Sequence, residues 1–154
     1  MKVESTVYPS KVEKLGGKAL VNFLVEEKSR VIGEDTHIYY EYQQVALQYD
    51  ALESDVDNVI AKESARILNE RKADALATMK VRTQSGKLFY ADDNSRMDIN
   101  DAINLATDAN VTTTIWKLAE EVNGSKLAEV SVDELKEARR LALEEKAKII
   151  GVLV

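Results

Sequence analysis

The most constraining feature of this sequence is a long stretch, residues 54–79, that contains neither glycine nor proline. Good helix formers dominate it, and aliphatic residues recur in it at helical spacing: Val56, Ile60, Ile67 and Leu68. Ser54 or Asp55 can cap its start by accepting hydrogen bonds from the free amides of the first turn. We predict one long helix with a narrow apolar stripe, which packs on one side only or on another subunit.

The residues before this helix indicate β structure. The segments ESTVY, ALVNFLV and THIYYEYQQVAL are rich in strand formers, and polar or glycine-containing links separate them. We predict a small antiparallel meander with strands near residues 2–8, 18–26 and 36–47. Pro9 is expected to close the first strand or to begin the turn after it. Residues 1–50 are therefore predicted to form a β-rich attachment lobe.

Short extended and helical patterns alternate after residue 79. A hairpin is predicted around Ser85-Gly86, then a helix from Met97 to Ala109, then a hairpin around Asn123-Gly124, where both residues tolerate positive φ. The last segment predicts a helix capped by Ser131 or Asp133, with these residues inward: Leu135, Ala138, Ala142, Ile149 and Leu153. The predicted fold class is α+β: the N-terminal antiparallel meander, the connecting helix 54–79, and a C-terminal ββαββα-type domain over residues 80–154.

The composition excludes several kinds of partner and site. The net charge is -6, with 21 basic against 27 acidic residues, so no summed positive field would hold a nucleic acid. The sequence has no cysteine and a single histidine, His37, which argues against thiolate sites and against zinc sites with several imidazoles. No apolar run approaches the length of a signal peptide core or a membrane span. We expect a soluble protein made in the cytosol, with no nucleic-acid or membrane partner and no cofactor.

The acidic run FYADDNSRMDIND, residues 89–101, raises the possibility of a calcium loop. Counted from Asp92, the EF-hand pattern fails at three positions, where Arg96, Met97 and Ile103 replace an oxygen ligand, the obligatory glycine and the bidentate glutamate. Ser95 followed by Asp98 instead has the form of a capping box before the helix, with the loop Asp92-Asp93-Asn94 leading into it. Asp92, Asp93 and Asn94 remain weak candidates for a cation site.

Catalytic patterns are absent from the sequence. Gly-x-Ser-x-Gly does not occur, and one histidine on a predicted strand makes a Ser-His-Asp triad improbable. A pair of glycoside-cleaving carboxylates cannot be recognised among 27 acidic residues, but the one tryptophan, Trp116, supplies little for a sugar-stacking cleft. We expect the chain not to be an enzyme, and an enzyme acting on glycans is the weaker alternative.

Aromatic residues supply the candidate interface. Tyr39, Tyr40 and Tyr42 lie on one predicted strand, where alternation places Tyr40 and Tyr42 on one face and Tyr39 on the other. They are explained either by packing within the sheet or by a partner surface, where tyrosine is enriched. Together with Trp116 they are our interface candidates.

The second half of the chain carries a resemblance to a known family. Its residues and their order are Gly86-Lys87-Leu88-Phe89, Ala91-Asp92, Ser95-Arg96, Ala102-Ile103, Thr114, Trp116-Lys117, Val130 and Leu135. This pattern, over residues 80–153, resembles a domain of unknown function found at the C-terminal ends of bacteriophage tail proteins. The front of the chain, with Tyr8-Pro9-Ser10 and the run from Tyr39 to Tyr42, is similar to small phage tail-region proteins.

The resemblance implies a non-enzymatic protein of the tail, tail-fibre or baseplate region, made in the bacterial cytoplasm and built into the virion. It implies partners among other tail or fibre proteins or copies of the chain itself, as a homo-oligomer. An assembly chaperone for tail fibres is the alternative. The family offers no catalytic residues to carry over.

Overall fold

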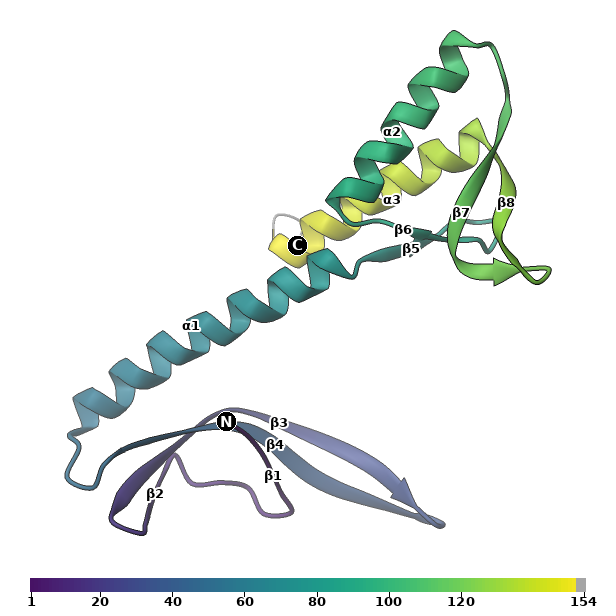
Figure 1. The fold of residues 1–154 in the computed structure, drawn as a ribbon. Coiled ribbons are helices and arrows are strands. Elements are labelled where there is room, and N and C mark those ends of the chain that lie inside the picture. Colours follow the sequence, from purple (N-terminus) through teal and green to yellow (C-terminus); the bar gives the residue numbers. More distant parts are fainter. Residues whose placement is uncertain (152–154) are drawn as a thin grey trace. The chain divides into compact units, whose positions relative to one another are not determined.

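The computed structural model describes residues 1–151 and has the predicted α+β class (Figure 1). The chain divides into two compact units, Met1–Leu68 and Asn69–Val154. The boundary falls inside the first helix, α1 (Glu53–Ala77). This helix lies within two residues of the predicted bounds at both ends, as expected for a stretch without helix breakers.

The first unit contains one antiparallel sheet of four strands: β1 (Lys2–Ser5), β2 (Val12–Leu15), β3 (Lys18–Ile32) and β4 (Asp35–Gln48). Their spatial order is β1-β4-β3-β2, so β2, β3 and β4 form the meander and β1 adds to the free edge of β4. Both inner hairpins turn over two residues, with Gly33 at φ 66° in the β3–β4 turn. Glycine suits that position because it adopts positive φ without a steric penalty.

Three predictions for this sheet were wrong. The first strand, predicted near residues 2–8, ends at Ser5, four residues before Pro9. Residues 12–15, predicted as part of a link, form β2, because the tight turn at Gly16-Gly17 folds them back onto β3. Residues 27–35, also predicted as a link, continue β3 into the turn at Gly33. The sequence did not indicate this part of β3 because it lacks the apolar pattern of a buried strand. Its residues are mostly charged or polar, since this two-stranded ribbon has solvent on both faces.

The second unit contains two hairpins and two helices. The hairpins are β5 (Lys80–Arg82) with β6 (Leu88–Tyr90), and β7 (Thr113–Val122) with β8 (Ser125–Ser131). The helices are α2 (Asp93–Asp108) and α3 (Val132–Ile150). Asn123 and Gly124 both have positive φ, 52° and 79°, which confirms the predicted Asn-Gly hairpin.

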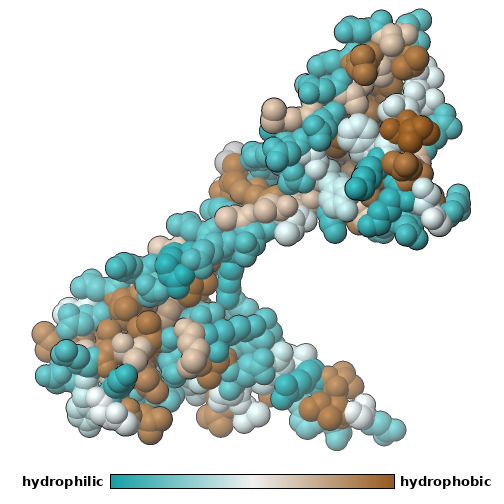
Figure 2. Space-filling view, viewed as in Figure 1, coloured by the Kyte–Doolittle hydropathy of each residue, from teal (hydrophilic) through white to brown (hydrophobic). Residues whose placement is uncertain are grey.

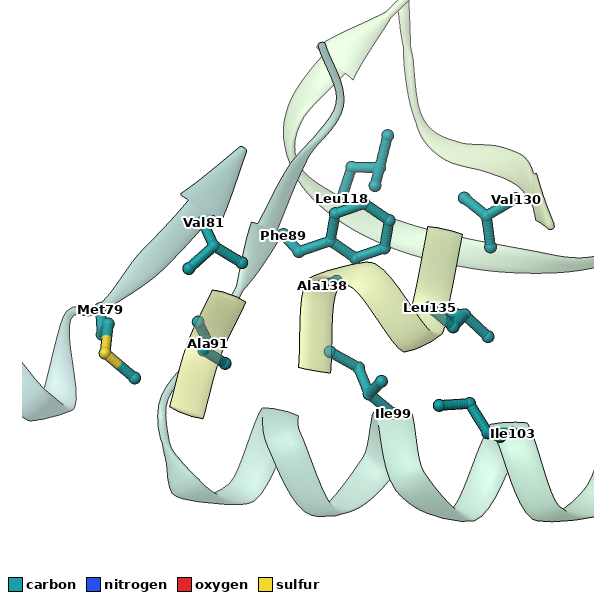
Figure 3. Close-up of a cluster of buried hydrophobic side chains, with 11 residues drawn as sticks. Met79, Val81, Phe89, Ala91, Ile99, Ile103, Leu118, Val130, Leu135 and Ala138 are labelled. Carbon is teal, nitrogen blue, oxygen red and sulfur yellow. The ribbon is translucent and has the colours of Figure 1, made fainter. Parts of the chain in front are cut away.

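The core of the second unit joins all of these elements (Figure 3). The close-up shows Phe89 of β6 beside Leu118 of β7, while Ile99 and Ile103 project from α2. The α3 side of the core is formed by Leu135, Ala138 and Ala142, all predicted to be inward, and Ile149 packs against it as a partly buried residue. Leu153, also predicted to be inward, lies outside the described residues.

The start of α2 differs from the prediction. The helix begins at Asp93, and Asp92 is its N-cap, with a carboxylate that accepts from the Ser95 amide at 3.1 Å and from the Ser95 hydroxyl at 2.6 Å. The predicted capping box at Ser95 is therefore wrong, and Asp93 and Asn94 belong to the first turn. Aspartate caps a helix as well as serine does, and here the serine hydroxyl itself is bound to Asp92.

The predicted cap of α3 is confirmed at Ser131. Its hydroxyl accepts from the Glu134 amide at 3.0 Å, and the Glu134 carboxylate accepts from the Ser131 amide at 3.0 Å. This reciprocal pair is a full capping box. Lys87, from the turn before β6, donates to both oxygens of the same carboxylate and so ties the first hairpin to the start of α3.

Candidate interaction surface

The outer part of the β3–β4 hairpin, residues 27–39, is a two-stranded ribbon that we call the arm. Pairing with β1 ends at Tyr40, and pairing with β2 ends at Val21, so within the arm β3 pairs only with β4. An isolated two-stranded hairpin is marginally stable in water. The arm is therefore the part of this sheet with the least support from its own chain.

A β-bulge at the base of the arm changes which side chains share a face. The register shifts between Phe23 and Glu26, and Leu24 takes a φ of 50°, so β3 carries one extra residue there. Before the bulge, Val21 lies opposite Val45 on the apolar face of the sheet. Beyond the bulge that same face carries Lys28 and Arg30, with Ile32 at the tip, and Val31 and Ile38 lie on the other face.

The charged face of the arm is paired within the chain. Glu41 accepts from Lys2 at 2.8 Å and from Lys28 at 2.7 Å, and its side chain is only 12% exposed. The hydrogen bonds from Lys2 and Lys28 hold the pKa of Glu41 below its usual value. On the same face, the Arg30 guanidinium lies 5.0 Å from the centre of the Tyr39 ring. These charges are already satisfied without a partner.

The opposite face of the arm carries exposed aliphatic side chains among the polar residues Glu27, Ser29 and Thr36. The register places Ser29 opposite Ile38 and Val31 opposite Thr36, so Val31 and Ile38 are diagonal neighbours on one face. Their exposed fractions are 71% and 54%, and Tyr40 continues the same face at the base of the arm. Figure 2 shows the apolar surface near the free end of the hairpin. We call Val31, Ile38 and Tyr40 the apolar face of the arm.

The predicted tyrosine candidates have different environments. Tyr42 is buried, and it lies opposite Val3 of β1. Tyr40 is half-buried and meets the Tyr8 ring edge-on, with 5.3 Å between the ring centres. Tyr39 lies on the charged face with Arg30. Only Tyr40 adjoins the exposed aliphatic residues.

Sequence reasoning missed Val31 and Ile38 as interface residues. Both belong to segments that looked like a polar link or ordinary sheet. A signal was present in β4, where apolar residues occupy odd positions at Val45 and Leu47 but even positions at Ile38, Tyr40 and Tyr42. Such a change of parity means that the apolar side chains move to the other face of the strand.

The long helix α1 is the other predicted interaction surface. Of its side chains, all within the described part of the chain, only Val56 is buried. Ile60 and Ile67 are half-buried, and Leu68 is 48% exposed. The helix thus keeps most of its narrow apolar stripe near the surface.

Two of the three candidate cation ligands, Asp92 and Asp93, are occupied by contacts within the chain. Asp92 caps α2, and its hydrogen bond from the Ser95 hydroxyl lowers its pKa. Asp93 accepts from Lys146 at 2.6 and 2.8 Å, which lowers its pKa as well. Among residues 1–151, no three histidine, aspartate or glutamate side chains come together in a way that could hold a metal ion.

Comparisons with protein-family models, with curated proteins and with solved structures found no match to this chain. The resemblance of residues 80–153 to a phage tail domain therefore stays a prediction. None of the helices that the structure describes has the length and apolar character needed to cross a bilayer.

Proposed function

We propose that this chain is a non-enzymatic structural protein of the bacteriophage tail, tail-fibre or baseplate region. It is made in the host cytoplasm, is built into the virion, and acts through contacts with other tail proteins or with copies of itself. The observation that best supports a role in protein contacts is the exposed apolar face of the arm. The resemblance of residues 80–153 supplies the phage context.

The exposed aliphatic side chains of the arm favour a partner that covers them. Exposure of large aliphatic side chains to water is unfavourable. Covering them would stabilise the complex by roughly 25 cal/mol for each Å² of apolar surface removed from water. Val31 and Ile38 also lie on strands whose outer backbone groups are not paired with a third strand. Exposed strand edges recruit further strands, and partner strands provide both hydrogen bonds and apolar cover.

The test uses purified particles of the phage that encodes this chain. Mass spectrometry is expected to find the protein in the particles at a fixed ratio to the tail proteins. If particles lack the protein and it occurs only in a soluble complex with a fibre subunit, the structural proposal is wrong and the protein acts in assembly. Its absence from both would remove the phage assignment.

A pair of arm variants tests the interface itself. Ile38→Lys places a charge on the apolar face, whereas His37→Lys places the same charge on the neighbouring charged face. We expect Ile38→Lys to reduce incorporation into particles at least about tenfold, since burying an unpaired charge costs more than 1.4 kcal/mol. His37→Lys is expected to be incorporated normally. Equal incorporation of both variants would contradict a role for this face.

A further inference from the structure

A pocket of about 380 Å³ lies in the second unit, at the side of α2. Its lining residues come from the end of β6, the first turns of α2 and the middle of β7: Tyr90, Ser95, Asp98, Trp116 and Lys117. The volume is at the lower end of the range for small-molecule sites. Two of the nine aromatic residues of the chain, including its one tryptophan, therefore meet at a single cavity.

Trp116 is held in place by the core behind it. It is partly buried and packs against the core cluster of the second unit, while its remaining surface lines the pocket. In the β7–β8 register it lies opposite Ala128, a small residue that leaves the ring room. Within residues 1–151, neither the indole N–H of Trp116 nor the hydroxyl of Tyr90 has a hydrogen-bond partner. Trp116 therefore brings an apolar surface and an unused polar group, and Tyr90 brings an unused hydroxyl, while the Lys80 ammonium lies over the Tyr90 ring at 5.5 Å from its centre.

Asp98 supplies the acceptor of the pocket. It is exposed on α2, one turn after Ser95, and its carboxylate has no hydrogen bond or ion pair within the described chain. Most other carboxylates around the start of α2 are engaged, as Asp92 and Asp93 show. The Ser95 hydroxyl donates to Asp92 and so keeps its lone pairs available as an acceptor.

Lys117, the fifth lining residue, also has no ion-pair partner in the part of the chain that the structure describes. Lys117 follows Trp116 on β7, so strand alternation directs its exposed side chain to the face opposite the indole, and Asp98 is the charged side chain on the α2 side of the pocket. An anionic ligand would meet Asp98 at a cost, and a cation would meet the Lys80 ammonium, which lies 5.5 Å from the centre of the Tyr90 ring. A purely apolar ligand would desolvate the unpaired carboxylate of Asp98. The lining therefore selects a neutral ligand that both donates and accepts hydrogen bonds.

We propose that this pocket binds one hexopyranose unit of a carbohydrate without chemical reaction. A sugar ring has an apolar C–H face that can lie on the Trp116 indole, and hydroxyls that donate to Asp98 and accept from the indole N–H. Each hydroxyl is both donor and acceptor, as the lining requires. The inference stands on the pocket alone and is independent of the assignment to a phage tail.

The binding experiment uses the full chain labelled with ¹⁵N. Probes are the methyl glycosides of glucose, galactose and mannose and N-acetylglucosamine, each titrated to about 50 mM, well above a Kd of about 1 mM. Glycylglycine and inorganic phosphate serve as zwitterionic and anionic comparisons. We expect at least one sugar to shift the indole N–H resonance of Trp116 and the amide of Asp98, and to change the fluorescence of this single tryptophan.

Two aspartates on α2 provide matched variants. Asp98→Ala removes the acceptor from the pocket, whereas Asp101→Ala changes an exposed aspartate of the same helix outside the pocket lining. We expect Asp98→Ala to weaken sugar binding about tenfold or more, as for loss of a hydrogen bond to a charged group, and Asp101→Ala to leave it unchanged. Circular dichroism checks that both variants fold.

Three results would overturn the proposal. One is the absence of any resonance shift at Trp116 and Asp98 with all four sugars. Another is a response to glycylglycine or phosphate without a response to sugars, which would assign the pocket to a different ligand class. The third is equal sugar binding by the Asp98→Ala and Asp101→Ala variants, because the sugar would then bind elsewhere.

Discussion

At the scale of single residues, Asp92 decides where α2 begins. Its carboxylate accepts from both the amide and the hydroxyl of Ser95. The hydroxyl bond is the largest cause of the lowered pKa of Asp92, whose usual value is 3.8. A carboxyl whose pKa is lower in the folded chain stabilises the fold above its unfolded pKa. That stabilisation is lost as the pH falls through the folded pKa.

Ser95→Ala tests this linkage. The variant loses the hydroxyl bond, so at neutral pH we expect the free energy of unfolding of the second unit to fall by about 0.5–1.5 kcal/mol. As the pH falls below 3.8 and Asp92 takes up its proton, the difference from the unaltered chain is expected to shrink. Urea unfolding followed by Trp116 fluorescence, in steps from neutral pH to about pH 2.5, measures both quantities.

Ser95→Thr is the matched control for this prediction, because threonine keeps the hydroxyl donor. It is expected to follow the pH dependence of the unaltered chain. A loss of stability in Ser95→Ala that stays the same at every pH would show that the hydroxyl acts by something other than its bond to the Asp92 carboxylate.

At the scale of elements, the capping box of α3 connects a helix start to two hairpins. Glu134 accepts from the Ser131 amide at the end of β8 and from Lys87 before β6. The first turn of α3 also contributes Leu135 to the core, and this side chain is fully buried. Fraying of this turn would therefore loosen packing as well as the helix end.

Ser131→Ala removes the side-chain half of the capping box. We expect it to lower the free energy of unfolding of the second unit by about 1 kcal/mol, the usual cost of losing a serine cap. Ser131→Asn keeps a capping oxygen and is expected to stay within a few tenths of a kcal/mol of the unaltered chain. Chemical unfolding monitored at Trp116 compares the three. Equal stability of the alanine and asparagine variants would contradict the cap.

At the scale of the whole molecule, the chain divides into two compact units, and each contains buried apolar residues. The buried cluster of the second unit draws all of its members from residues 79–142. A segment that contains its own core is able to fold alone. The first unit has a smaller set of buried residues around Val21 and Phe23, and it carries the arm.

A fragment of residues 69–154 tests this independence. We expect it to fold, to give a cooperative urea transition at Trp116, and to match the full-length midpoint closely, because the core residues are all retained. The comparison is clean because the one tryptophan lies in this unit. A midpoint well below that of the full chain would show that the first unit stabilises the second.

Local rules account for much of this fold. The helix at residues 53–77, the Asn123-Gly124 hairpin and the Ser131 cap were predictable because each depends on residues near in sequence. The continuation of β3 through residues 27–32 was not, because its charges are paired with residues of β1 and β4 that lie far away in sequence. The start of α2 was missed because Asp92 and Ser95 are both residues that can cap a helix. The local sequence does not show which of the two is the N-cap.

By itself the sequence determined the α+β class, the long helix and the turns at Ser85-Gly86 and Asn123-Gly124, since backbone preferences and periodicity act over a few residues. Tertiary structure decided which side chains are free to meet a partner. The bulge at Leu24 brings Val31 and Ile38 onto one exposed face of the arm. The packing of α2 and β7 brings Asp98 and Trp116 to the lining of one pocket. These groupings join separate strands and helices, and only packing and strand register set the distances between them.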